Sequence, residues 1–239
     1  MGSDPIFSHK WLDKLSSKIQ IEKVILQDGF ISLKRIMQLL FMIKTNDIFW
    51  LFKRFLRNYI LQKNIQKICK VKGIKLNQVK SVNTDNFISK VQEGNVNILL
   101  SFNGVEIWNK DLLNSPSIGC INVHLGELPY FKGLSPVVHS INSGKGRVSA
   151  TIHWMIPKVD GGKVISENII QLKNKDTILK LHDRLNMGSV DLIKQSLDEI
   201  KKNNYKKFEN IENKEDFIKP YRSAKFRDIL KARNILKNI

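Results

Sequence analysis

Cysteine is scarce in this chain, which has two among its 239 residues. Cys69 and Cys120 form no C-x-x-C pair, and no His/Cys cluster has the spacing of metal ligands. The sequence therefore suggests neither a disulfide framework nor a zinc site. Both cysteines lie in apolar segments, so we expect them to be buried free thiols. Hydrophobic residues make up 42% of the chain, which is enough for an ordinary packed core.

Long apolar runs and acidic residues are also few. No run approaches the ~20 residues that a membrane-spanning helix needs, and the polar N-terminus has no secretory signal, so we expect a cytoplasmic protein. Lysine and arginine number 40 against 22 aspartates and glutamates, a formal net charge of +18. Such an excess favours an anionic partner, namely nucleic acid, a membrane surface or a phosphorylated small molecule, although biased codon usage would produce the same composition.

Short β-branched runs alternate with amphipathic segments, a pattern typical of an α/β fold. We expect one catalytic domain over residues 1–205, followed by a basic C-terminal extension over 206–239. The predicted strands cover residues 21–26, 72–76, 97–102, 117–124, 148–156 and 163–170, and the predicted helices cover 7–19, 85–93, 137–142, 176–201 and 225–237.

Residues 33–70 form a long basic segment with an aromatic cluster around Phe49. This pattern fits a membrane-surface helix, but aromatic stripes at helical spacing more often pack in an interior or a dimer interface. We expect two helices here, separated near residues 45–47, with packing as the main role.

Three polar residues stand out between Gly119 and Asp160. Asn122 and His124 are two residues apart on an apolar strand, so they point to the same face at its carboxyl end, where parallel sheets bind ligands. Asp160 lies at the tip of the following hairpin. Taken singly, these residues fit a turn-bonded amide, a satisfied core histidine and an ordinary turn aspartate. Together they predict a proton-handling site, because buried polar groups are costly without partners or a role.

The segments NVHLGELPYFKGLSPVVHSINSG and ATIHWMIPKVDGGKVI resemble the core of the folate-dependent formyltransferases. The family pattern is Asn-x-His, Leu-Pro, an aromatic-basic-Gly loop, Thr-x-His and Asp-x-Gly, and all of these motifs occur here in order. The resemblance implies a Rossmann-like fold: a mostly parallel sheet flanked by helices, with a C-terminal hairpin and helix. The family's first strand has no visible counterpart, because the sequence begins at the turn that comes after it.

The resemblance also implies roles for individual residues. Asn122 and His124 would stabilise the oxyanion, while His124 and Asp160 would handle the proton of the attacking amine. The loop after the third strand would bind N10-formyltetrahydrofolate largely through its backbone, and no metal is needed. His153 and Thr151 have expected supporting roles only. The implied folate-binding residues are Phe102, Asn103, Gly104 and Val105.

The segment C-terminal to the core bears on the identity of the acceptor. This segment is short for a tRNA-binding barrel, and the aromatic-basic-Gly loop resembles the tRNA and sugar enzymes more than the glycinamide ribonucleotide enzymes. We therefore expect a sugar N-formyltransferase that acts on a nucleotide-linked aminosugar in O-antigen or lipopolysaccharide synthesis, and the resemblance to the sugar enzymes also implies a homodimer. The alternatives are a methionyl-tRNA or glycinamide ribonucleotide formyltransferase and a degenerate, non-catalytic homologue. Candidate phosphate contacts are Lys132, Tyr221, Arg222 and Lys225.

Overall fold

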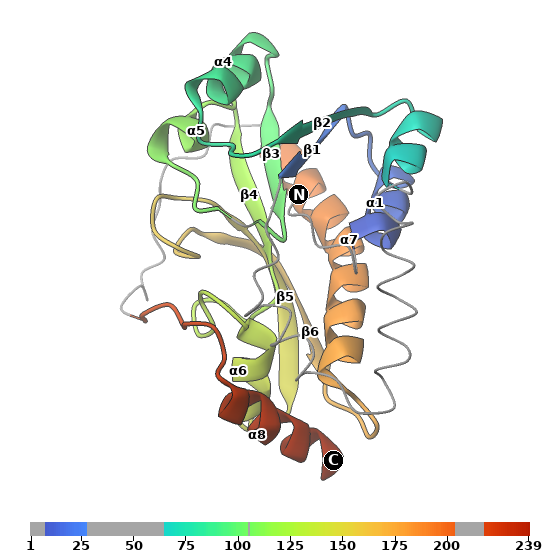
Figure 1. The fold of residues 1–239 in the computed structure, drawn as a ribbon, viewed down its shortest axis with the longest axis vertical. Coiled ribbons are helices and arrows are strands. Elements are labelled where there is room, and N and C mark those ends of the chain that lie inside the picture. The colour runs from blue at the N-terminus through green and yellow to red at the C-terminus, as the bar shows by residue number, and fades with distance from the viewer. Residues whose placement is uncertain (1–7, 28–64, 105, 204–217) are drawn as a thin grey trace.

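A computed structural model describes residues 8–27, 65–104, 106–203 and 218–239. Within these ranges strands and helices alternate, which confirms the predicted α/β class (Figure 1). A further helical stretch covers residues 65–71. The labelled elements are α1 (Ser8–Ser16), β1 (Lys23–Gln27), β2 (Lys75–Val79), α4 (Asp85–Glu93), β3 (Ile98–Phe102), α5 (Lys110–Asn114), β4 (Gly119–His124), α6 (Pro136–Asn142), β5 (Arg147–Trp154), β6 (Val164–Gln171), α7 (Ile178–Lys202) and α8 (Phe226–Lys237).

The described strands form two sheets. In the first sheet β1 pairs with β2 in parallel, and in the second the order is β3-β4-β5-β6. The β3–β4 pair is parallel, whereas β5 and β6 form the predicted hairpin and join the sheet antiparallel. Two of the four strand pairs are therefore parallel. Among the described residues no strand pairs with both sheets.

Side chains link the two sheets into one core. Val24 of β1 and Phe102 of β3 belong to the same cluster of buried residues. Trp11 of α1 stacks on Phe102 with ring centroids 3.7 Å apart. At the carboxyl ends of the strands, the Gln27 amide donates to the carboxylate of Glu106, which also accepts from the backbone N–H of Val82. These contacts hold the two sheets together without a shared strand.

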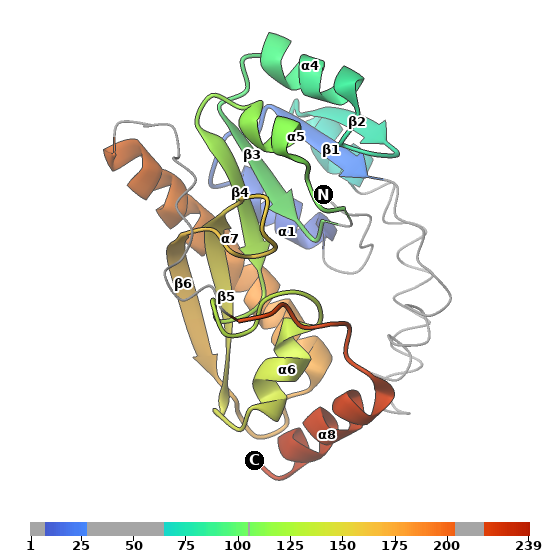
Figure 2. The same ribbon diagram turned by 90° about the vertical axis from the view of Figure 1, so that its left-hand side faces the viewer.

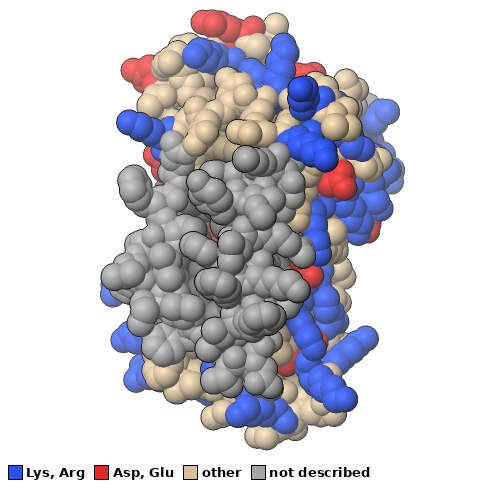
Figure 3. Space-filling view, turned by 45° about the vertical axis from the view of Figure 1, so that its right-hand side comes forward, with Lys and Arg blue, Asp and Glu red and all other residues tan. Residues whose placement is uncertain are grey.

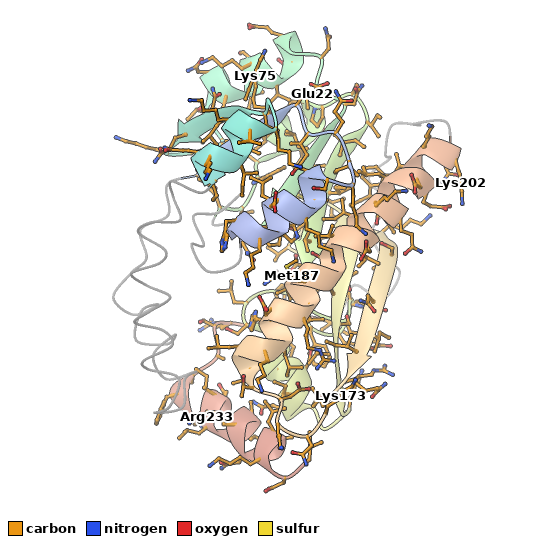
Figure 4. The ribbon with its side chains drawn as sticks, turned by 90° about the vertical axis from the view of Figure 1, so that its right-hand side faces the viewer. Glu22, Lys75, Lys173, Met187, Lys202 and Arg233 are labelled. Atoms are coloured by element: carbon orange, nitrogen blue, oxygen red, sulfur yellow. The ribbon has the colours of Figure 1, made fainter. Side chains whose placement is uncertain are left out.

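Helices cover both faces of the larger sheet. Helix α7 crosses one face of β5 and β6, and α6 lies on the other (Figures 2 and 4). The inner face of α7 is apolar, with Leu181, Leu185 and Ile193 fully buried. Helix α1 packs on α7, where the Trp11 indole N–H donates to Ser189 Oγ at 3.0 Å. Burial of this apolar face stabilises the packing of α7 on the sheet.

The C-terminal residues pack on the domain. Helix α8 lies against α6, with Ile229 and Ala232 buried, and Asn142 donates to the Asp228 carbonyl at 2.9 Å. The described part of the predicted 206–239 extension therefore contacts the domain directly.

The predicted basic segment 33–70 lies largely outside the described residues, and so does the predicted break near residues 45–47. Only residues 65–70 of this segment are described. They are helical, and Ile65 and Cys69 are buried. The described end of the segment thus packs in the interior, whereas the aromatic cluster around Phe49 lies outside the described residues.

Candidate active site

Asp160 lies at the centre of a group of polar contacts at the carboxyl end of β4. Its Oδ2 accepts the backbone N–H of Gly133 at 2.7 Å and lies 3.5 Å from His124 Nδ1. Its Oδ1 lies 3.5 Å from His153 Nε2. The hairpin between β5 and β6 supplies Asp160, whose φ of 48° is a left-handed conformation that aspartate tolerates in turns. The structure thus brings together the predicted His124 and Asp160.

Electrostatics hold Asp160 as a carboxylate. Burial alone would raise the pKa of this carboxyl, but the neighbouring His124, the hydrogen bond and charge of His153 and the Gly133 N–H more than offset it, so the pKa lies well below its ordinary value. The pKa of His124 is lowered. Its burial is the largest cause and outweighs the opposing attraction of Asp160. The resting pair is therefore an ionised aspartate beside a neutral imidazole.

Hydrogen bonds fix the tautomer of His124. Its Nε2 lies 2.7 Å from the Phe131 carbonyl, and because a carbonyl only accepts, Nε2 carries the proton. The other nitrogen, Nδ1, faces Asp160 with its lone pair and can take a proton there. Gly126 packs against the ring, since a Cβ at this position would lie 2.8 Å from Nε2. The imidazole is therefore held in one orientation.

His153 and Asn122 form a second pair, across the β4–β5 register. His153 Nδ1 donates to the Trp154 carbonyl at 2.8 Å, so in the neutral ring Nε2 accepts from the Asn122 amide at 3.2 Å. One amide hydrogen of Asn122 is used in this bond, which leaves the second for a ligand. His153 was expected to have only a supporting role, yet it contacts both Asn122 and Asp160. Its place in the Thr-x-His motif was the available signal.

This arrangement provides the parts for acyl transfer to an amine. Such a reaction needs a donor for the oxyanion and an acceptor for the amine's proton. The Asn122 amide can donate, and His124 Nδ1 can accept a proton that the adjacent Asp160 carboxylate then stabilises. Within the described residues no group of three His, Cys, Asp or Glu side chains could hold a metal ion.

The predicted folate loop comes after β3 at the same edge of the sheet. Phe102 pairs with Val123 across β3 and β4, so the next residue, Asn103, lies level with His124. The Phe102 ring is buried against Trp11, which leaves only its backbone near the loop. Asn103 has a φ of 49°, and its Nδ2 is buried without a hydrogen-bond partner. Gly104 is the next residue, whereas Val105 lies outside the described residues.

The four predicted phosphate contacts lie in different environments. Lys132 is only 1% exposed, a position that does not favour direct contact with a phosphate. The other three residues are exposed and lie on the segment before α8, near the loop that contains Gly133: Tyr221, Arg222 and Lys225. The phosphate contacts remain predictions.

Fold and site together define an α/β domain whose buried histidine–aspartate pair can accept a proton. Over residues 54–197 the chain matches the Formyl transferase family, and we conclude that it belongs to this family. The methionyl-tRNA formyltransferase of Bacillus velezensis is 31% identical over 142 residues, which cover 59% of this chain and 45% of that protein. That of Lysinibacillus sphaericus is 38% identical over 95 residues, which cover 40% and 30% respectively. The chain thus spans less than half the length of these curated relatives.

Solved structures agree on the fold. The phosphoribosylglycinamide formyltransferase of Bacillus halodurans superposes with a TM-score of 0.59 at 14% identity, covering 85% of this chain and 96% of that one. A sugar N-formyltransferase from a Shewanella species superposes with a TM-score of 0.51 at 21% identity, covering 90% and 88%. At these identities the likeness shows the fold alone. In the described part of the chain no helix is long and apolar enough to cross a membrane.

Proposed function

We propose that this chain transfers the formyl group of N10-formyltetrahydrofolate to the amino group of a nucleotide-linked aminosugar. The observation that carries the proposal is the contact of His124 and His153 with one carboxylate, Asp160, with Asn122 bonded to His153, in a member of the Formyl transferase family. These side chains meet the two needs of acyl transfer to an amine, an oxyanion donor and a proton acceptor.

The reaction begins when the acceptor amine attacks the formyl carbon, and the developing oxyanion is stabilised by the Asn122 amide. The amine's proton passes to His124 Nδ1, and the imidazolium that forms lies 3.5 Å from the Asp160 carboxylate. The bond between the formyl carbon and the folate nitrogen then breaks, and the imidazolium returns a proton to that nitrogen. Atoms and charges balance without a metal.

The described residues fit a folate beside this site. The buried Nδ2 of Asn103 has no partner in the structure, and such an orphaned donor suits a polar edge of a ligand. Gly104, the next residue, has no side chain, so the backbone of this loop can approach a planar ring closely. N10-formyltetrahydrofolate would supply the formyl group.

Charge supports an anionic acceptor. The net charge of +18 suits a diphosphate-linked sugar, and the exposed Arg222 and Lys225 lie on the segment that contacts the Gly133 loop. In Figure 3, lysine and arginine lie at the top, along the right side and at the bottom of the part of this face that the structure describes.

Charged methionyl-tRNA is the second candidate acceptor, because curated relatives at 31% and 38% identity carry that activity in their names. Salt separates the two candidates. Binding of tRNA should weaken steeply with ionic strength through counterion release, whereas binding of a sugar diphosphate should weaken far less.

The test is turnover with N10-formyltetrahydrofolate and a panel of nucleotide-linked 3-amino and 4-amino deoxysugars, monitored by the change in folate absorbance. Glycinamide ribonucleotide and methionyl-tRNA complete the panel. Turnover with one aminosugar supports the proposal. Turnover with methionyl-tRNA alone would show that the acceptor is the second candidate. Absence of both turnover and folate binding would refute it and favour a non-catalytic homologue. Light scattering of the purified protein tests the proposed homodimer.

A further inference from the structure

The segment before α8 holds the loop that contacts Asp160. Residues 219–225, which we call the C-terminal strap, run beside residues 132–135. The backbone N–H of Tyr221 donates to the Lys132 carbonyl at 2.8 Å, and the Tyr221 carbonyl accepts from the Leu134 N–H at 3.0 Å. These two bonds bracket Gly133, which forms a parallel bridge with Tyr221. Gly133 in turn donates its N–H to Asp160 at 2.7 Å.

Side chains reinforce this backbone pairing. The Tyr221 ring stacks on His139 of α6, with centroids 4.3 Å apart and an interplanar angle of 22°. His139 Nε2 donates to the Arg222 carbonyl at 3.1 Å, and the Ala224 N–H donates to Ser135 Oγ at 3.1 Å. The C-terminal strap is therefore tied to both the loop and helix α6.

The C-terminal strap approaches the backbone of Gly133 closely. Its φ is +87°, and a Cβ there would lie 2.5 Å from the Tyr221 carbonyl oxygen. A glycine is required both for this backbone conformation and for the close approach of the strap. A shift of the strap would therefore move Gly133 and the N–H that it directs at Asp160.

We infer that the C-terminal strap is a positioning element for the active site and that Tyr221 fixes Asp160 through Gly133, rather than binding the phosphates of the acceptor. The inference rests on the proposed function for its kinetic readout, but the geometry can be tested without turnover. Tyr221 touches no reacting atom and acts through the backbone of the loop.

The test compares Tyr221→Ala with Tyr221→Phe. Loss of the ring removes the stack on His139 and loosens the strap, so we expect Tyr221→Ala to lower kcat by about tenfold to a hundredfold, the range that small misplacements cost. The KM for the acceptor should change less than about threefold, because a positioning residue does not hold the substrate. Tyr221→Phe keeps the ring and should restore kcat. Leu230→Ala, an exposed residue of α8, is the control for changes in this part of the chain.

A second readout needs no substrate. Titration of the His124 ring nitrogens by NMR reports the nearby carboxylate, and its midpoint should move to lower pH in Tyr221→Ala if Asp160 swings away. Circular dichroism checks folding, and His139→Ala replaces Tyr221→Ala if the latter does not fold. An unchanged kcat and an unchanged titration in a folded variant would overturn the inference, as would a raised KM with kcat intact. A moved titration in a protein without formyl transfer would refute the proposed function alone.

Discussion

Replacing Asp160 by asparagine tests the chemistry most directly. The change keeps the shape of the side chain but removes the charge that lies 3.5 Å from both His124 and His153. At an effective dielectric constant of about 20, a unit charge at this distance stabilises an imidazolium by about 4–5 kcal/mol. Solvent and the remaining dipoles will replace part of this stabilisation, so we expect the transition state to lose about 3–4 kcal/mol of stabilisation. That corresponds to a fall in kcat of roughly 10²–10³.

The assay is steady-state turnover at saturating N10-formyltetrahydrofolate, with the folate dissociation constant measured separately. Folate affinity should stay within about threefold, because Asp160 acts on the proton and not on the folate loop. Asp176→Asn is the matched control, since Asp176 is also a paired carboxylate, bonded to Arg184 on α7 away from the site. A fall of less than about tenfold for Asp160→Asn in a folded protein would refute the assignment of the proton route.

Three further changes probe the site and the core. Gly126→Ala should lower kcat by about a hundredfold, because the added Cβ would lie 2.8 Å from His124 Nε2 and displace the ring. The melting temperature of the variant shows whether the fold is also destabilised. Trp11→Ala should lower the free energy of unfolding by about 3–5 kcal/mol in urea titrations, since it leaves a cavity beside Phe102. Burial lowers the pKa of His124, so this histidine binds a proton more readily in the unfolded chain than in the folded one. The free energy of unfolding should therefore decline as pH falls below about 6.5, and His124→Gln should weaken this decline.

Local sequence signals predicted most of the fold. The α4 bounds agree with the prediction because Thr84 caps the helix, its hydroxyl accepting the Phe87 N–H. The β5–β6 hairpin and α7 were predictable from clear apolar periodicity. The short α5 was missed, since five residues give too little periodicity to detect. Strand β2 begins at Lys75, later than the predicted 72–76, because residues 72–73 form a turn.

The sequence predicted the side chains of the candidate site but not the backbone groups that orient them. Motif spacing indicated Asn122, His124 and Asp160, because the proposed chemistry lies in their side chains, and side-chain types can be read directly from the sequence. The tautomer of His124 depends instead on the Phe131 carbonyl, and the orientation of Asp160 depends on the Gly133 N–H. Backbone groups are present at every residue, so the bonds that these two groups make could not be read from the sequence, although Gly133 itself belongs to the aromatic-basic-Gly motif.

The C-terminal strap explains why a sequence-based assignment of Tyr221 is difficult. An exposed tyrosine beside Arg222 and shortly before Lys225 looks like a phosphate-binding stretch when only residue types are considered. In the structure the backbone of Tyr221 is committed to the Gly133 loop and its ring to His139. The position of the proposed catalytic carboxylate thus depends on three segments far apart in the chain: the β5–β6 hairpin, the loop after β4 and the strap. A change in any one of them should alter kcat before it alters the binding of either substrate.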